Sequence, residues 1–383
     1  MRSIFIKING LKTISYFLIL FTYLYIIVFT FFHNRKSDGY VLGDWLINYQ
    51  DGGFKRRGLS GSFFFFLQDL TGFQLNILVF LVQVIIITIF FYFFVKIIVS
   101  KSITLWYLSL LLSPLGFIAY FNCVDYVGKK EFILFAIFSY FVYQINCSTL
   151  TRKKEYIICI LIFIATLFHE IVFFFIPYFV LLLIIYNKNI NFKLYIKYFL
   201  AGFVPVILIL FFGNEINEGN SLQILKERGV VINSGIFFWN VNEREYIVSQ
   251  AKDYSLYVIS FLISFFHIKF YLKIEKLDEK IGWGFLFAFL YTLPLFLLAI
   301  DWGRWFYIHM IMIIMVLGFL LKAKKDGDLS KTQFVINKSN IVLLLFIVFS
   351  LAYRVEMSGK GFSFEGFFYR VFFVPLELIH KMM

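Results

Sequence analysis

The sequence predicts an all-α, polytopic integral membrane protein. Apolar residues make up 61% of the 383 residues and charged residues only 15%, and the mean hydropathy is +0.83. A soluble domain of this size could not keep so much apolar surface away from water. The apolar residues also fall into stretches of about 20, the length that a helix needs to cross a hydrocarbon core of about 30 Å.

Ten apolar stretches follow one another, at about 14–32, 74–95, 103–121, 132–147, 156–186, 198–212, 255–268, 283–300, 306–321 and 340–353. The fifth is long enough for two helices and has His169 and Glu170 near its middle. Because two ionisable residues at the centre of one span are costly, we expect two short helices that turn at this pair. The expected total is about eleven transmembrane helices in a single domain, 1–383, without an interior linker.

The distribution of Lys and Arg predicts a cytoplasmic N-terminus, because cytoplasmic loops carry the excess of these residues. With this orientation the cytoplasmic segments hold 20 Lys/Arg and 6 Asp/Glu, and the opposite face holds 16 and 17. Those segments are 1–12, 96–102, 149–155, 187–197, 269–282 and 322–339. The net charge of +13 therefore follows largely from topology and requires no nucleic-acid partner.

Two long loops are expected on the outer face, at about 33–73 and 213–254. The first contains an amphipathic stretch near Gly43 to Gln50. It also contains the apolar run Phe63 to Leu67, which we expect to form a re-entrant or interfacial helix. We expect the second loop to cover a cavity as a lid.

The three cysteines, Cys123, Cys147 and Cys159, lack the spacing of a disulfide framework or a zinc site. The sequence therefore indicates no metal and no other cofactor.

Four polar clusters interrupt the apolar pattern, and the predicted topology places all of them on the outer face. They are DGGFKRRGLSG at 51–61, DYVGKKE at 125–131, the pair His169–Glu170, and DWGRW at 301–305. Function is therefore expected on that face.

The first cluster favours an anionic ligand. Its glycines let the backbone approach a ligand closely, and guanidinium groups bind phosphate oxygens through two hydrogen bonds. We expect Asp51, Lys55, Arg56 and Arg57 to lie at an anionic head group. The alternative is a basic patch that holds lipid phosphates, although such patches usually lie on the cytoplasmic face, where the surface is most negative.

In the third cluster, either His169 or Glu170 can serve as a general base. Adjacent helical positions diverge by about 100°, so one of the two can be catalytic while the other supports it. The alternative is a polar pair that only satisfies hydrogen bonds at a helix break.

The fourth cluster has two interpretations: Asp301 and Arg304 pair with each other, or Arg304 binds a phosphate while Asp301 orients it. The loop that contains Lys129 and Lys130 is equally ambiguous. Taken together, acids, one histidine and fixed cations suit a reaction in which a base activates a hydroxyl and cations stabilise a departing phosphate. Glycosyl transfer from a lipid pyrophosphate has this chemistry.

The four clusters, over about residues 40–310, resemble those of O-antigen polymerases of the Wzy type. The resemblance implies an enzyme of the bacterial inner membrane with a periplasmic active face and, by analogy with related transferases, a GT-C-like helical bundle. Such an enzyme moves a growing glycan from undecaprenyl pyrophosphate onto a lipid-linked repeat unit. The implied partners are this lipid-linked oligosaccharide, membrane lipid and a chain-length regulator.

On this resemblance, Arg56, Arg57 and Arg304 bind the pyrophosphate, and Glu170 or His169 is the base. Lys55, Lys129 and Lys130 add to substrate binding, and Asp301 and Asp51 support the site. One departure is that such polymerases often have a very large outer loop, whereas 213–254 is modest. A glycan ligase would share the donor site, and a flippase or transporter for the lipid-linked unit is the alternative from a different class.

Overall fold

The computed structural model describes residues 6–7, 10–50, 52–188, 192–214, 216, 220–323, 333–334 and 338–373. It is dominated by helices, which confirms the predicted all-helical fold. The only strands among these residues are β1 (Ile6–Lys7) and β2 (Gln333–Phe334), which pair in antiparallel register. Six helical segments of the described chain are long and apolar enough to cross a membrane.

These long segments are α1 (Leu11–Arg35), α4 (Leu75–Ile98), α11 (Phe192–Phe212), α14 (Ala251–Ile274), α15 with α16 (Glu279–Tyr291 and Leu293–Leu298), and α17 (Trp302–Leu320). Shorter helices complete the bundle: α7 (Glu131–Asn146), α8 (Arg152–Phe168), α9 (Ile171–Phe174), α10 (Ile176–Asn187) and α18 (Lys338–Ala352).

The stretch at 103–121 was expected to be one helix, and this prediction is wrong. The structure has α5 (Leu105–Leu111) and α6 (Ala119–Asn122), joined by a turn. Pro114 lacks the amide hydrogen that a continuous helix needs, and a Cβ at Gly116 would lie 2.5 Å from the carbonyl oxygen of Leu110. The turn compensates with its own hydrogen bonds, such as Gly116 N to Ser113 O at 2.8 Å.

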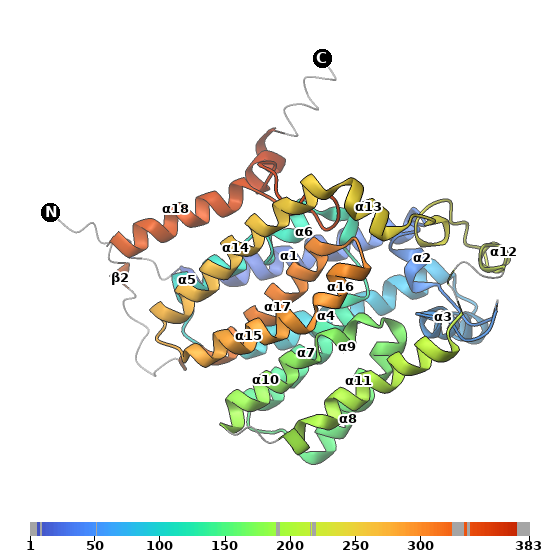
Figure 1. The fold of residues 1–383 in the computed structure, drawn as a ribbon, viewed down its shortest axis with the longest axis horizontal. Helices are drawn as coiled ribbons and strands as arrows, with labels where there is room; N and C mark the ends of the chain where they lie inside the picture. The colour runs from blue at the N-terminus through green and yellow to red at the C-terminus, as the bar shows by residue number, and fades with distance from the viewer. Residues whose placement is uncertain are drawn as a thin grey trace.

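Helix α17 forms the centre of the bundle. About 89% of its apolar window is buried, whereas the corresponding share is 22–39% in the other five long segments. It packs against α4, α5, α7, α14 and α16, and Figure 1 shows it enclosed among them. Its first turn carries Arg304, so a charged side chain lies at the end of the most buried helix.

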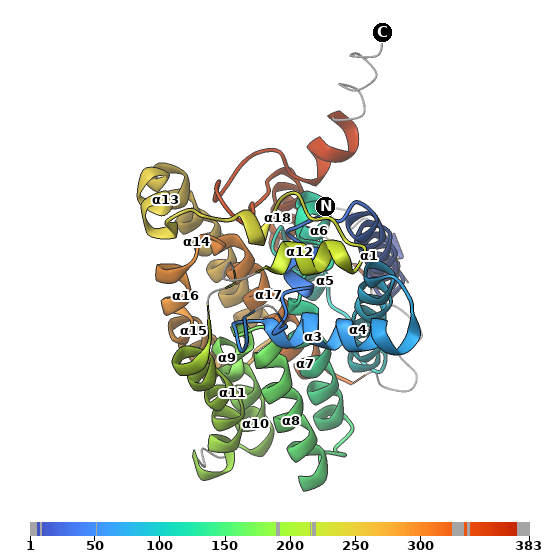
Figure 2. The same cartoon turned by 90° about the vertical axis from the view of Figure 1, so that its right-hand side faces the viewer.

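The short elements of the two long loops gather at the right-hand end of the molecule in Figure 1, which we call the site end. They are α2 (Leu42–Trp45), α3 (Gly58–Thr71), α12 (Ser221–Glu227), the 3₁₀ turn Ile236–Phe238 and α13 (Glu243–Ser249). Figure 2 has this end facing the viewer and shows α3 and α12 in front of the bundle, where Arg228 pairs with Asp69 of α3 at 2.8 Å.

Helix α3 includes the apolar run that was expected to be a short re-entrant or interfacial helix, and it is longer than that run. Phe64 and Phe65 are buried against the bundle, whereas Phe66 and Leu70 are exposed. The helix therefore has one face on protein and one apolar face directed outward.

Candidate functional site

The chain breaks between α8 and α9 at the predicted pair. Helix α8 ends at Phe168, His169 is extended with φ −158° and ψ 113°, and α9 begins at Ile171. The expected turn at this pair is confirmed, although the second of the two expected helices is interrupted at Phe175, between α9 and α10. The side chain of His169 is 1% exposed and that of Glu170 is 20% exposed, so only the carboxylate reaches the surface.

Arg57 holds two carboxylates. Its Nη2 donates to Oε1 of Glu170 at 2.7 Å and its Nε donates to Oε2 at 3.1 Å. Its Nη1 donates to Oδ1 of Asp44 at 3.0 Å. The residue has φ 65°, in the left-handed region, which costs a non-glycine residue about 1 kcal/mol or more. The ion pairs offset this cost and fix the guanidinium at the start of α3.

Arg304 holds a second set of partners. Its Nε donates to Oε1 of Glu131, its Nη1 to Oδ2 of Asp301 at 3.1 Å, and its Nη2 to Nε2 of His169 at 3.3 Å. The side chains of Arg304 and Glu131 are 5% and 6% exposed. The Asp301–Arg304 pair, one of the two interpretations of the DWGRW cluster, is therefore present, and a phosphate could reach this guanidinium only by displacing a carboxylate.

His169 joins the two sets. Because a guanidinium can only donate, Nε2 of His169 must accept, and the neutral ring then carries its proton on Nδ1. Nδ1 lies 3.5 Å from Oε2 of Glu170. The backbone N–H of Ile171, 3.4 Å from Nδ1, is a weaker contact that this tautomer does not satisfy. The imidazole thus connects Arg304 to Glu170 in one continuous network.

The two lysines of the DYVGKKE cluster are buried beside this network. Nζ of Lys130 is 3.8 Å from Oδ1 of Asp44 and has no hydrogen-bond partner among the described residues. Burial lowers the pKa of Lys130 to about 8, although the charge of Asp44 opposes the shift. Burial alone would raise the pKa of Asp44, but Lys130 and Arg57 hold it well below its ordinary value. The carboxylate of Asp44 therefore stays ionised.

Gly128 fixes the loop before these lysines. It has φ +81°, which a residue with a side chain rarely adopts. Its carbonyl oxygen accepts from Nε1 of Trp45 at 2.9 Å and from Nε2 of Gln83 at 2.7 Å. Gln83 in turn accepts from Asn34 at 2.6 Å. Three helices thus hold the segment that places Lys129, Lys130 and Glu131.

The remaining residues of the DGGFKRRGLSG cluster have separate environments. Arg56 is 47% exposed and its Nε lies 3.5 Å from Oε1 of Glu170. Lys55 is fully buried, and its backbone forms a parallel bridge with Asn214 after α11. Asp51 lies outside the described residues. Arg56 is therefore the cation of this cluster that is accessible to a ligand from outside.

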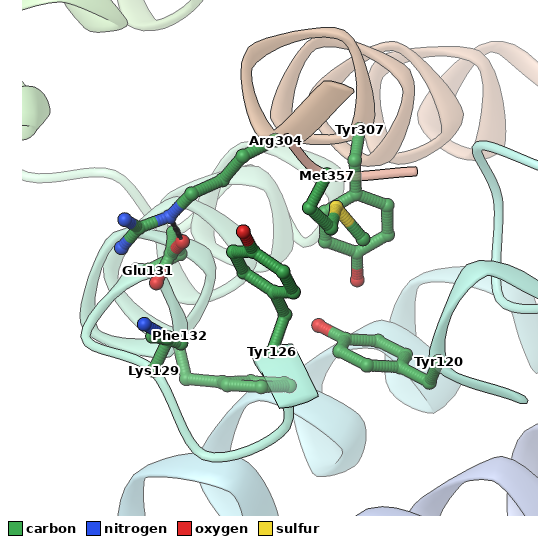
Figure 3. Close-up of a pocket in the computed structure, with 8 residues that line it drawn as sticks. All are labelled: Tyr120, Tyr126, Lys129, Glu131, Phe132, Arg304, Tyr307 and Met357. Carbon is green, nitrogen blue, oxygen red and sulfur yellow. Dashed lines mark hydrogen bonds and ion pairs between the residues drawn. The ribbon is translucent and has the colours of Figure 1, made fainter. Parts of the chain in front are cut away.

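A small pocket lies beside the Arg304–Glu131 pair (Figure 3). Oε2 of Glu131 is buried and has no hydrogen-bond partner among the described residues, while the buried hydroxyl of Tyr307 interacts with that of Tyr120. The pocket is lined by Tyr120, Tyr126, Lys129, Glu131, Phe132, Arg304, Tyr307 and Met357. A buried carboxylate oxygen without a partner makes the pocket a place for water or for a polar group of a ligand.

Two acids of the site were not predicted from the sequence, and a third was left ambiguous. Asp44 is a single acid in the apolar run VLGDWLI, and Glu131 shared the ambiguity of Lys129 and Lys130 in its cluster. Glu243 belongs to α13 in the second long loop; burial raises its pKa and the nearby charge of Asp301 raises it further. An isolated acid within an apolar run was the available signal for Asp44, while Glu243 had no comparable signal in its polar surroundings.

Among the described residues, no group of three or more His, Cys, Asp or Glu side chains is arranged to hold a metal ion. Comparisons with protein-family models, with curated proteins and with solved structures find no match.

Proposed function

We propose that the chain is a glycosyltransferase of the bacterial inner membrane that polymerises lipid-linked repeat units at the periplasmic face, with a GT-C-like helical bundle. One observation carries the proposal. Residues from all four polar clusters meet in a single network, in which the partly exposed carboxylate of Glu170 lies 3.5 Å from the exposed cation Arg56 and the partly exposed carboxylate of Asp301 pairs with Arg304.

The proposed reaction is a displacement at a sugar. A hydroxyl oxygen of the acceptor repeat unit attacks the anomeric carbon of the growing glycan. The bond from that carbon to the pyrophosphate oxygen breaks, and undecaprenyl pyrophosphate leaves with the electron pair. The hydroxyl proton passes to a carboxylate. Glu170 and Asp301 are 20% and 25% exposed and suit this role, whereas His169, at 1% exposure, suits the positioning of Glu170.

The cations have different parts in the proposal. Arg56, whose side chain is 47% exposed and whose Nε lies 3.5 Å from Glu170, binds the pyrophosphate of the donor. Arg57 and Arg304 are occupied by carboxylates, so they fix the acids and supply positive potential to the leaving group. Lys129 and Lys130 add to this potential from the buried side.

The test is the length of the glycan made in cells that depend on this protein. Arg56→Ala, Glu170→Gln and Asp301→Asn are expected to leave normal amounts of protein in the membrane, with glycan of single-repeat length for Arg56→Ala and for at least one carboxylate variant. Lys197→Ala is the matched control, because it removes an ion pair with Glu155 (2.6 Å) near the start of α8, away from the site. Long glycan chains in all three site variants would refute the proposal.

A transporter of the lipid-linked unit is the second candidate, because two ionisable residues lie inside the bundle. His309 of α17 contacts the hydroxyls of Tyr178 and Thr292 at 2.7 and 2.8 Å, and His267 of α14 contacts that of Ser109 at 2.8 Å. Buried polar residues in the interior are typical of transport paths. Loss of a transporter would trap lipid-linked units in the cytoplasmic leaflet, whereas loss of a polymerase would let them accumulate in the periplasmic leaflet.

A further inference from the structure

Two aromatic rings lie close to Lys129, a third packs against one of them, and none of the three has a part in the proposed reaction. Nζ of Lys129 lies 5.8 Å from the ring centre of Tyr40 and 5.1 Å from that of Tyr126. The ring of Tyr40 meets that of Trp239 edge to face, with centres 6.5 Å apart. We call Tyr40, Tyr126 and Trp239 the aromatic shelf. Its members come from the loop between α1 and α2, the loop before α7 and the second long loop, so the fold assembles it from distant segments.

The shelf is open to the outside. Tyr40 is 46% exposed and its neighbour in space, Trp239, is partly exposed, as is Tyr126. The polar residues at its rim can exchange hydrogen bonds with a ligand: Asp38 is partly exposed and accepts from the backbone N–H of Tyr40 at 2.8 Å, and Asp125 and Asn240 are exposed. Rings that only anchor a chain in lipid do not need a lysine and carboxylates around them.

The shelf is also continuous with the site. Tyr126 and Lys129 line the pocket in Figure 3 together with Glu131 and Arg304. In the figure the Tyr126 ring lies between Arg304 on one side and Tyr120 on the other. The hydroxyl of Tyr126 contacts that of Ser358 at 2.7 Å, so a hydrogen bond to the segment after α18 holds this ring in place. A ligand on the shelf would therefore lie directly beside the charged network.

We propose that the aromatic shelf binds a pyranose ring of the acceptor glycan, next to the carboxylates that would receive its hydroxyl proton. One face of a pyranose presents C–H groups, which pack on the negative face of an aromatic ring, while its hydroxyls hydrogen-bond at the rim. Asp38 and Asp125 supply acceptors for those hydroxyls, and the exposed side-chain amide of Asn240 supplies a donor. The inference rests on the proposed function, since it names where the second substrate of that reaction binds.

The experiment measures sugar binding without catalysis. The probe is the repeat-unit oligosaccharide, released by mild acid from the lipid-linked pool of the host cell and added to the purified full-length protein in detergent. Saturation-transfer NMR is expected to show contact with the wild type. Tyr40→Ala and Trp239→Ala are expected to raise the Kd at least fivefold, and Tyr40→Phe is expected to bind like the wild type because the ring is kept.

Trp283→Ala is the matched control. Trp283 is 69% exposed but belongs to the first turns of α15, outside the shelf, so its loss should leave the Kd unchanged. No saturation transfer to the wild type, or equal affinity in Tyr40→Ala and Trp239→Ala, would overturn the shelf as a sugar site and identify its rings as membrane anchors. If the oligosaccharide binds as expected but the site variants still make long glycan, the shelf stands and the proposed polymerase function fails.

Discussion

The two ends of the helix bundle carry charges in opposite environments. At the site end, Lys130, Arg304 and Asp44 have side chains that are 0%, 5% and 5% exposed. At the other end, the pair Lys197–Glu155 is 31% and 21% exposed, and Lys12 reaches a carbonyl oxygen from an exposed position. Removing a charge from water costs several kcal/mol unless a partner compensates it. The stability of the site end therefore depends on each of these buried charges having a partner of opposite charge, whereas the stability of the other end does not.

Arg304→Ala is expected to have the largest effect, because it leaves Glu131 charged and buried without its partner. The free energy of unfolding should fall by about 3–5 kcal/mol, measured by SDS titration in mixed micelles. Adding Glu131→Gln to this variant should recover part of the loss, because the uncompensated charge is then gone. A loss below about 1 kcal/mol would show that this end tolerates a broken pair as a surface does.

Asp44→Asn is expected to cost less, about 1–3 kcal/mol. Arg57 keeps its two hydrogen bonds to Glu170 in this variant, and Lys130 can lose its proton, since its pKa is already lowered to about 8. The same SDS titration measures the change. An effect as large as that of Arg304→Ala would mean that the partners of Arg57 and the partners of Arg304 do not contribute to stability independently.

Lys130→Met tests the burial of charge at the site end through the pH dependence of stability. In the folded state the pKa of Lys130 is about 8, against an ordinary value of 10.5. Between these values the unfolded chain binds a proton that the folded chain does not, so this group makes stability rise with pH in that window and contributes no slope below it. The difference in Tm between wild type and Lys130→Met should therefore change from pH 8 to 10.5. A constant difference would refute the lowered pKa.

Lys197→Ala should have the smallest effect, below about 1 kcal/mol, because its ion pair with Glu155 is partly solvated. High salt should reduce even this effect, while the cost of Arg304→Ala should hardly change, because buried pairs are screened less. Equal salt dependence of the two variants would remove the distinction between the ends.

The sequence predicted the helical fold and the four polar clusters that contribute to the network, because apolar length and isolated polar clusters are local patterns. The turn at His169–Glu170 followed from the cost of two ionisable residues within one span. The partners did not follow: Arg57 and Glu170 are 113 residues apart, and their contact depends on how α3 packs against α8. Asp44 was missed because its partners, Arg57 and Lys130, are likewise set by packing. Its local pattern, an acid in an apolar run, also fits a surface turn.

The helices next to the two central arginines, Arg304 and Arg57, differ in how much of their surface is covered by protein. Arg304 stands on α17, which is enclosed by protein on nearly all sides. Arg57 stands at the start of α3, whose outer face exposes Phe66 and Leu70. Where that outer face lies against lipid, the thickness and chain composition of the bilayer act directly on the helix that follows Arg57, whereas protein shields α17 from them. Only one of the two helices that carry the network's arginines is therefore open to the solvent around the bundle.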